Sequence, residues 1–199
     1  MNELSKMKLI YDNAKNKSTE NLPSAEVVLF IDEKAYANIP QGNHLLNTVN
    51  HHRIKMSHTG IPFDMCLVED AQEAISKYKC AIFTAPRPTE NGKKAIELCR
   101  KYSVPFISST EEKPYYDIDE LCNFLVSSGI HCYNDNGDVF YCGNGFIGIH
   151  KVDDGETKIT LPKKYKLRPL LGAEKSEFET DTIIVTGPKH STNFYEIME

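Results

Sequence analysis

The chain has 199 residues, of which 40% are hydrophobic and 26% are charged, and its formal net charge is -5. This composition is typical of a soluble globular protein, and the length fits one large domain or a domain with a small appendage. A dedicated nucleic-acid-binding protein needs clustered Lys and Arg to neutralise phosphates, so the negative charge argues against that class. No apolar run approaches the roughly 20 residues that cross a bilayer.

The first predicted element is a short amphipathic helix over residues 3–16, whose apolar side chains fall on one stripe. A polar linker that contains Pro23 follows this helix. The polar N-terminal stretch lacks the apolar core of a secretory signal, so we expect a cytoplasmic protein.

Six cysteines occur in the chain, and none of them forms a CxxC or CxxxC pair. They are Cys66, Cys80, Cys99, Cys122, Cys132 and Cys142. The first four lie within apolar segments, where a reduced thiol behaves as a small hydrophobic group. We therefore expect buried free thiols in a reducing compartment, and neither a zinc ribbon nor a thioredoxin-type motif.

Residues 18–129 show an alternation of strands and helices. Continuous apolar runs, typical of strands covered on both faces, predict strands at 26–32, 63–68, 80–83 and 104–108. Helical patterns predict helices at 45–57, 71–77, 90–102 and 118–128. Strands that alternate with helices imply right-handed crossovers, so we expect an α/β domain with a doubly wound, mostly parallel sheet.

Residues 130–199 lose the helical signal and carry turn dipeptides at short intervals. Asn136-Gly137, Asn144-Gly145 and Asp154-Gly155 supply the positive φ angles of tight hairpins. Strand-like segments lie at 130–133, 139–142, 146–150, 157–161, 182–185 and 194–197. The predicted organisation is therefore a leading helix and linker (1–17), an α/β domain (18–129) and a small antiparallel β domain (130–199).

The carboxyl ends of the predicted parallel strands form the candidate site, because ligands bind there in doubly wound sheets. The candidate crevice residues are Asp32, Glu33, Glu69, Asp70, Thr84 and Arg87. The acidic pairs could hold a metal or act as acid and base, but such residues more often cap the next helix, and we favour that role. No glycine-rich phosphate loop follows any strand, so nucleotide binding of the Rossmann or P-loop type is not expected. We predict no metal and no other cofactor.

The turn after the third predicted strand carries no nucleophile. A nucleophile elbow places Ser or Cys at a sharp turn from strand to helix, whereas this chain has Thr84 there. Cys80 lies at the opposite end of the same strand and is interpreted as a core residue. These positions argue against a cysteine amidotransferase, and no catalytic residue is assigned.

Three histidines, His44, His51 and His58, are spaced seven residues apart. This spacing separates neighbours by roughly 10 Å along a helix axis, which is too far for one metal ion to bind all three. We interpret them as a solvated or subunit-facing stripe.

Two motifs lie near the turns of the predicted β domain. The segment 134–138 lacks the spaced acidic ligands and the terminal Glu of a calcium-binding EF-hand, so it is interpreted as a hairpin turn. Phe140, Tyr141 and Phe146 could form a sugar-stacking surface, but packing in a β core is favoured, and we predict that these rings are buried.

Several short segments resemble one family. They are 25–33 (AEVVLFIDE), 44–47 (HLLN), 60–64 (GIPFD), 78–83 (YKCAIF), 130–133 (IHCY), 145–150 (GFIGIH) and 157–162 (TKITLP). Together they resemble the amidotransferase-like trimerisation domain and the small C-terminal β domain of bacterial β-galactosidases, which follow a catalytic (β/α)8 barrel. The leading helix is similar to the segment that joins barrel and domain. The resemblance implies a flavodoxin-like, class I amidotransferase-like fold for the α/β domain.

The resemblance also implies a role outside catalysis. The acid and the nucleophile of such glycosidases would lie on the barrel. A barrel takes about 200–250 residues of repeated βα units, and these are missing from this chain. We expect a non-catalytic C-terminal region, or a stand-alone relative, of a β-galactosidase-like glycoside hydrolase that serves assembly and shapes the rim of a partner's sugar site. The implied partners are further copies of the chain, in a homo-oligomer, or a glycosidase barrel, but neither nucleic acid nor a membrane.

Two alternatives stay open at the level of the sequence. One is a hydrolase or amidotransferase-like enzyme in which Asp32, Glu69 and Thr84 converge on an unrecognised site. The other is a carbohydrate-binding module that uses the aromatic residues of the predicted β domain.

Overall fold

The computed structural model describes residues 5, 8, 10–12, 23–37, 40, 43, 47–172 and 176–198. Two compact units divide the chain: one runs from Ala25 to Cys132, and the other includes everything from Tyr133 on. Of the predicted helix at 3–16, only residues 5, 8 and 10–12 are described and all are helical; the remainder lies outside the described residues.

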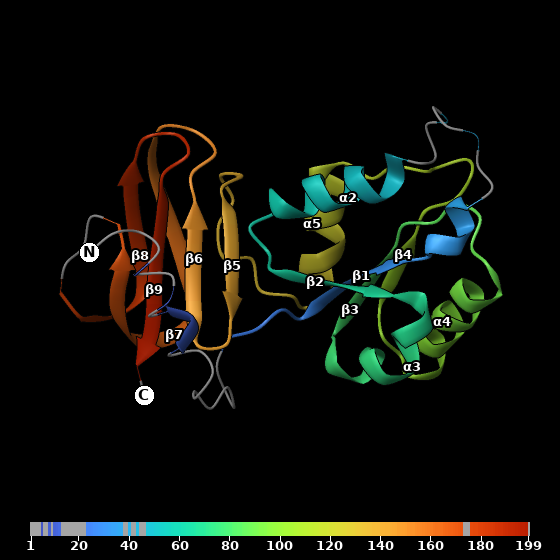
Figure 1. Ribbon diagram of the computed structural model, residues 1–199, viewed down its shortest axis with the longest axis horizontal. Helices are drawn as coiled ribbons and strands as arrows, with labels where there is room; N and C mark the ends of the chain where they lie inside the picture. Colours follow the sequence, from blue (N-terminus) through green and yellow to red (C-terminus); the bar gives the residue numbers. More distant parts are fainter. Residues whose placement is uncertain are drawn as a thin grey trace. The chain divides into compact units, whose positions relative to one another are not determined.

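A four-stranded parallel sheet forms the centre of the α/β unit (Figure 1). Its strands are β1 (Val27–Ile31), β2 (Phe63–Leu67), β3 (Cys80–Phe83) and β4 (Phe106–Ser108). Their order in the sheet is β2-β1-β3-β4. All four predicted strands are therefore present and parallel, as expected for a doubly wound sheet.

Helices cover both faces of this sheet (Figure 1). The helices are α2 (Thr48–Ser57), α3 (Ala71–Ala74), α4 (Glu90–Lys101) and α5 (Ile118–Ser127), with short 3-10 turns η1 (Glu33–Tyr36), η3 (Val68–Asp70) and η4 (Ile75–Lys77). Val27 and Leu29 of β1 belong to the core that α2 and α5 cover. Val28 and Phe30 belong to the core that α3 and α4 cover. This alternation follows from the pleat, which turns successive side chains to opposite faces.

Side-chain caps fix where two of these helices begin. Thr89 precedes α4, and its hydroxyl accepts a hydrogen bond from the Gly92 amide at 3.3 Å. Asp117 and Glu120 form a reciprocal capping box at the start of α5. Each cap satisfies amides that the helix itself leaves unbonded.

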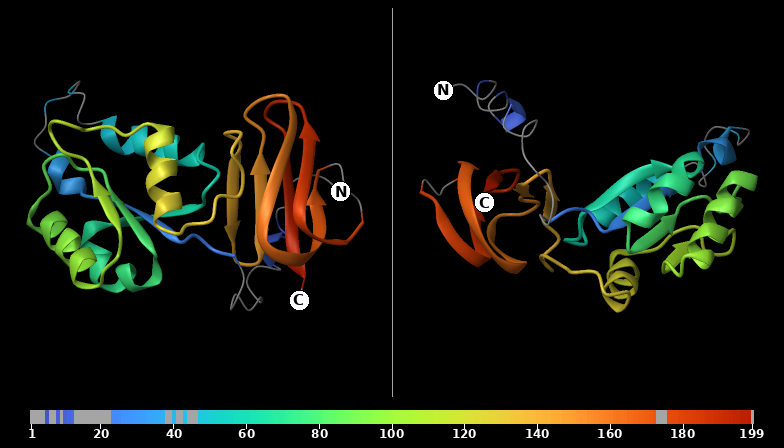
Figure 2. Two further views of the ribbon diagram at one scale, coloured as in Figure 1. Left: turned by 180° about the vertical axis from the view of Figure 1, so that it is seen from behind. Right: turned by 90° about the horizontal axis from the view of Figure 1, so that it is seen from below.

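The β unit is a five-stranded antiparallel sheet, seen from two further sides in Figure 2. Its strands are β5 (Val139–Gly143), β6 (Phe146–His150), β7 (Gly155–Leu171), β8 (Phe178–Gly187) and β9 (Thr192–Met198). Their order is β5-β6-β9-β7-β8. The predicted fold class, a parallel α/β sheet followed by a small antiparallel β region, is confirmed.

The Asn144-Gly145 turn joins β5 to β6 as predicted. Both residues have positive φ angles, 51° and 78°, and Gly143 pairs directly with Phe146. Two central residues with positive φ define a type I′ hairpin, whose twist matches that of the strands. Asparagine and glycine are here because other residues tolerate this conformation poorly.

Three sequence predictions in the β region are wrong. No hairpin forms at Asp154-Gly155, because β9 lies between β6 and β7 in the sheet. The turn at 134–138 precedes β5 and does not join two paired strands. Residues 130–133 form no strand, since Ile130 packs into the core of the α/β unit while Tyr133 packs into the β core.

None of the helices within the described ranges combines the length and the apolar character that a bilayer crossing requires.

Candidate functional site

The predicted site residues follow strands that are neighbours in the parallel sheet. Phe30 of β1 pairs with Phe83 of β3, so Asp32 and Thr84 come just after adjacent strand ends. Leu67 of β2 pairs with Ile31 of β1, which brings Glu69 to the same edge. The three strand ends therefore lie at one edge of the sheet. The hydrogen bonds and ion pairs of each side chain then show whether it is available to a ligand.

Asp32 has only 1% of its surface exposed and is bound to the start of α4. Its carboxylate accepts a hydrogen bond from the Thr89 amide at 2.7 Å and one from the Thr89 hydroxyl at 2.9 Å. A carboxylate at a helix N-terminus is stabilised by the unbonded amides and the helix dipole. Asp32 thus ties the end of β1 to the first turn of α4.

Gly92 makes this close approach possible. A Cβ atom at position 92 would lie 2.4 Å from the Asp32 Oδ2 atom. Any side chain there would push the carboxylate away from the helix, so the glycine is required by contact rather than by an unusual backbone angle. The Asp32 carboxylate is therefore enclosed by α4.

Thr84 is fully buried and belongs to a chain of hydroxyl groups. Its hydroxyl donates to the Phe30 carbonyl at 3.3 Å, and the Tyr36 hydroxyl donates to the Thr84 carbonyl at 3.0 Å. The Tyr36 hydroxyl also lies 2.9 Å from the Thr48 hydroxyl of α2. Burial raises the pKa of Tyr36, although the Thr48 and Thr84 hydrogen bonds oppose it. Tyr36 is therefore a neutral link between η1, α2 and the residue that follows β3.

The remaining four candidates are exposed, and two of them, Glu69 and Arg87, form ion pairs. Glu69 lies 2.9 Å from the Lys34 ammonium, and this hydrogen bond lowers the pKa of Glu69. Arg87 forms an ion pair with Glu111. Glu33 begins η1 and Asp70 precedes α3; neither makes a side-chain capping bond to its helix. The capping role that we favoured for the acidic pairs is thus seen only at Asp32, and it is directed at α4.

Two buried polar groups near this edge were not identified from the sequence. His52 of α2 is fully buried; its Nδ1 atom lies 2.7 Å from the Thr48 carbonyl, and its Nε2 atom has no hydrogen-bond partner among the described residues. Burial lowers the pKa of His52 to about 4. The Ser109 hydroxyl, just after β4, is also buried without a partner in the described part of the chain. The sequence drew attention to the spacing of other histidines and gave no signal for either group.

A shallow groove of about 210 Å³ lies between η3, α3 and α4. Of the six predicted residues, Glu69 lines it, together with Asn91 and Lys94 of α4 among others. The groove presents a carboxylate, an amide and an ammonium group to solvent. It does not combine a nucleophile with a base, and Asp32 and Thr84 do not line it. Of the three residues of the enzyme alternative, only Glu69 lines this groove.

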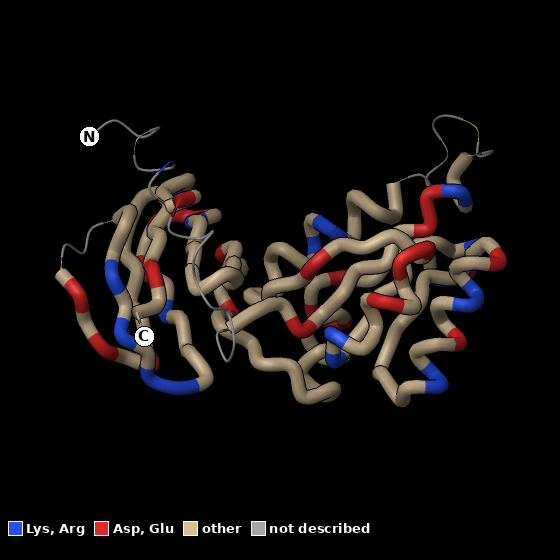
Figure 3. Tube along the Cα trace, turned by 60° about the horizontal axis from the view of Figure 1, so that its bottom comes forward, with Lys and Arg blue, Asp and Glu red and all other residues tan. Residues whose placement is uncertain are grey.

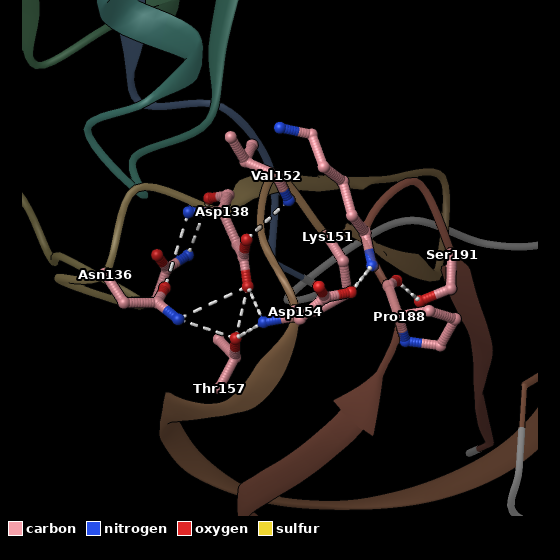
Figure 4. A network of polar contacts seen from close by, with 10 residues as sticks. Asn136, Asp138, Lys151, Val152, Asp154, Thr157, Pro188 and Ser191 are labelled. Atoms are coloured by element: carbon pink, nitrogen blue, oxygen red, sulfur yellow. Dashed lines mark hydrogen bonds and ion pairs between the residues drawn. The ribbon is translucent and has the colours of Figure 1, made fainter.

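The β unit contains a second buried polar cluster, centred on Asp138 and Lys151 (Figure 4). Both side chains are 2% exposed and form an ion pair, and the Thr157 hydroxyl bonds to each of them. The Val152 amide donates to Asp138 at 2.7 Å. Burial alone would raise the pKa of Asp138, but the bonds from Lys151, Thr157 and Val152 outweigh it and hold that pKa below its usual value. The enclosed pair, with Thr157, links the residue before β5 and the residue after β6 to β7.

The aromatic residues of the β unit are not exposed together. Phe140 and Phe146 are buried, at 3% and 5% exposure, whereas Tyr141 is 60% exposed. Phe140 and Tyr141 are successive residues of β5 and therefore point to opposite faces. Burial is thus confirmed for the two phenylalanines and wrong for Tyr141, and the flat surface needed for sugar stacking is reduced to a single exposed ring.

The predicted histidine stripe is only partly described. His51 lies in α2 with its Nε2 atom 2.9 Å from the Tyr116 carbonyl, and His58 follows the last residue of the helix. His44 lies outside the described residues. Within the described residues, no group of three or more His, Cys, Asp or Glu side chains is arranged to hold a metal ion.

No protein-family model matches the sequence, and no curated protein matches it. Solved structures do match. A β-galactosidase from Bacillus circulans sp. alkalophilus is 11% identical, and the match covers 87% of this chain and 41% of that chain with a TM-score of 0.61. A catalytic mutant of a GH42 β-galactosidase from G. stearothermophilus is 10% identical over 88% of this chain and 41% of that one, with a TM-score of 0.55. A GH42 exo-carrageenase from Bacteroides ovatus is 11% identical over 86% and 29%, with a TM-score of 0.53.

These matches establish the fold of the chain. It is that of a part of β-galactosidase structures, as the resemblance of its short segments predicts. The chain spans 41% of the length of the two β-galactosidase chains and 29% of the carrageenase chain. The likeness thus concerns a region of these enzymes rather than the whole of them.

Proposed function

We propose that this chain is a non-catalytic, assembly-forming region, or a stand-alone relative, of a β-galactosidase-like glycoside hydrolase of the bacterial cytoplasm. In this role the α/β unit holds copies of the protein together. A catalytic barrel, in the same polypeptide or in a partner, supplies the acid and the nucleophile of glycoside hydrolysis. The chain itself then shapes the surroundings of that site.

The observation that carries this proposal is the extent of the structural match. It covers 87% of this chain, which is more than either unit alone, so it includes both the parallel and the antiparallel sheet. Two sheets in the same order are a more specific likeness than a doubly wound sheet alone, because that sheet hosts many unrelated functions.

The strand-end edge supports the same proposal. Asp32 is bonded to the start of α4, and Thr84 is fully buried among backbone carbonyls and hydroxyls. A general acid or base must come within hydrogen-bond reach of its substrate, which an enclosed side chain does not. These contacts make the enzyme alternative the weaker one.

A hydrolysis assay tests the non-catalytic role. We expect the purified chain to release no chromophore from nitrophenyl galactosides above the rate in buffer. The matched variants are Asp32→Asn and Glu69→Gln, purified in the same way. Turnover by the unmodified chain that falls in either variant would replace our proposal with the enzyme alternative.

The helical layer formed by α2 and α5 is the surface that we expect to mediate assembly. Ile54 of α2 and Val126 of α5 are 50% and 52% exposed. By contrast, the exposed side of α4 is charged, with Lys93, Lys94 and Glu97 among its residues. Elsewhere Lys and Arg are interspersed with Asp and Glu over both units (Figure 3). Apolar side chains that remain exposed on neighbouring helices favour contact with another protein surface.

Light scattering over a range of concentrations tests this assembly. We expect a homo-oligomer that Ile54→Glu and Val126→Glu dissociate, because a charge buried in an apolar contact is unfavourable. Tyr141→Ser, which changes an equally exposed residue of the β unit, is the control and should leave the mass unchanged. A strict monomer at every concentration would contradict the assembly role of this chain.

A further inference from the structure

Two cysteines of the α/β unit share one hydrogen-bond acceptor. The thiol of Cys122 in α5 lies 3.9 Å from the Thr59 carbonyl oxygen, and the thiol of Cys132 lies 3.5 Å from the same oxygen. Because both sulfur atoms approach one oxygen, they lie in the same part of the α/β unit. The pKa of Cys122 is raised, first by burial and then by the proximity of Cys132, so the two thiols are also within electrostatic reach of each other.

The end of α5 explains why residues ten positions apart meet. Gly129 has a φ angle of 81°, and the Ile130 amide donates to the Leu125 carbonyl at 3.1 Å. A left-handed glycine with such a bond ends a helix and reverses the chain. Ile130 then packs into the same apolar cluster as Leu125, so the following residues lie against α5. Cys132 thereby returns to the vicinity of Cys122.

These two thiols differ from the other cysteines in accessibility or in surroundings. Cys80 of β3 and Cys99 of α4 are fully buried, where a reagent in solution does not reach them. Cys66 and Cys142 are partly exposed, as Cys122 and Cys132 are, but they belong to β2 and to β5 of the other unit. Accessibility and a neighbouring thiol are both needed for disulfide formation.

We propose that Cys122 and Cys132 are a redox-responsive pair that forms a reversible disulfide by exchange with a small-molecule disulfide such as oxidised glutathione. One of the two thiols loses its proton, and the thiolate then attacks a sulfur atom of the reagent and releases the first small thiol. The second thiolate displaces the second small thiol from the resulting mixed disulfide. The protein loses two hydrogen atoms and gains one S–S bond, while the reagent is reduced to two thiols.

The position of the pair gives this bond a structural effect. Cys132 is the last residue of the α/β unit, and Tyr133 is the first residue of the β unit. Residues 130–132 form neither helix nor strand, so packing and a few hydrogen bonds hold them against α5 in the reduced protein. The disulfide ties this boundary covalently to α5 and closes the loop between the two cysteines, which restricts the unfolded chain.

Peptide mapping of the full chain after oxidation tests the proposal. The protein is equilibrated with oxidised and reduced glutathione, alkylated and digested with chymotrypsin. This protease cleaves at Phe124 and Leu125, between the two cysteines, and at Tyr133, between Cys132 and Cys142. We expect the peptides of Cys122 and Cys132 to be joined by one bond that a reductant breaks. Glutathione adducts without a cross-link, or cross-links to Cys66 or Cys142 instead, would overturn the proposal.

Variants separate this pair from unspecific oxidation. Cys122→Ser and Cys132→Ser should each abolish the cross-link, whereas Cys66→Ser and Cys142→Ser should leave its yield unchanged. Circular dichroism establishes that each variant is folded. The oxidised wild-type protein should melt at a higher temperature than the reduced one, and Cys132→Ser should lose that difference. A cross-link that forms only in denaturant contradicts the inference; neither readout depends on the hydrolase-related role of the chain.

Discussion

Asp32 of the α/β unit and Asp138 of the β unit are both acidic residues with 1% of the residue surface exposed, yet they are held in different ways. Asp32 is bonded to the amide and the hydroxyl of Thr89, which are neutral donors at the start of a helix. Asp138 is paired with the buried ammonium of Lys151. The first arrangement relies on close backbone approach and the helix dipole, and the second relies on an opposite charge.

This difference determines which substitutions destabilise each unit. Removing the cation of the β unit leaves a carboxylate buried without a counter-charge, which is among the most destabilising changes that a folded protein meets. In the α/β unit, the sensitive feature is the space next to Asp32 and not a countercharge. Two substitutions and one change of pH test the contrast between the units, in decreasing order of expected effect.

Lys151→Met should destabilise the β unit by about 3–5 kcal/mol, because the enclosed Asp138 then loses its counter-charge and must either stay ionised without it or take up a proton. Denaturant unfolding followed by far-ultraviolet circular dichroism measures the loss. The matched control is Lys189→Met, since Lys189 pairs with Asp153 at 3.4 Å on an exposed surface. That variant should lose less than about 1 kcal/mol. Equal losses in the two variants would show that the buried ion pair contributes no more to stability than the exposed one.

Acidification should weaken the α/β unit before the β unit. His52 has a pKa of about 4 in the folded protein and a usual value of 6.5. Below pH 6.5 the unfolded chain therefore binds a proton that the folded one does not, and stability falls until about pH 4, by about 3 kcal/mol in full. The pKa of Asp138 is lowered from 3.8, so its contribution is kept above that pH and is lost only on further acidification.

Hydrogen exchange resolved by peptide at several pH values distinguishes the two units. His52→Leu should flatten the dependence between pH 6.5 and 4, because it removes the titrating group. His51→Asn changes the neighbouring half-buried residue and should keep the dependence. If peptides of the β unit lost protection first on acidification, the assignment to His52 would be wrong.

Gly92→Ala should destabilise the α/β unit by about 1–3 kcal/mol, because the new methyl group would overlap the Asp32 carboxylate at 2.4 Å. The same change in an ordinary helix interior stabilises by roughly 1 kcal/mol, so the sign itself is the test. Chemical denaturation of the single variants and the double variant gives the coupling. In an Asp32→Ala background the penalty of Gly92→Ala should shrink, and what remains comes from the Pro88 Cβ atom, 2.9 Å from the new methyl group. An unchanged penalty would mean that the contact with Asp32 does not limit this position.

The strands of the α/β unit could be predicted from the sequence, because strands that are buried on both faces are continuous apolar runs. β7 was largely missed: its expected 157–161 is part of a strand that spans Gly155–Leu171. Pro162 and Pro169 argue against a strand, since proline lacks an amide donor. Both lie at register irregularities, between Thr160 and Tyr165 and at the Pro169–Leu171 step, where the missing donor is tolerated.

The candidate site could be predicted from the sequence only in part. Strand order places Asp32, Glu69 and Thr84 at one edge, as the sequence predicts. The partners that fix their roles come from loops and helices far along the chain, such as Thr89 for Asp32. No local pattern encodes such pairs. The burial of Lys151 was equally hidden, because lysine is almost always exposed and nothing in its neighbourhood marks the exception.

The two-residue turn at Asn144-Gly145 has a consequence for the faces of the antiparallel sheet. It sets the register in which Phe140 pairs with Ile149 and Tyr141 with Gly148. Side chains alternate along a strand, so a shift of one position exchanges the inner and the outer set. If this turn had one more residue and the strand sequences were unchanged, Phe140 would be exposed to solvent and Tyr141 would be buried, unless a β-bulge accommodated the insertion. The length of one loop, more than the aromatic rings themselves, therefore decides which ring water can reach.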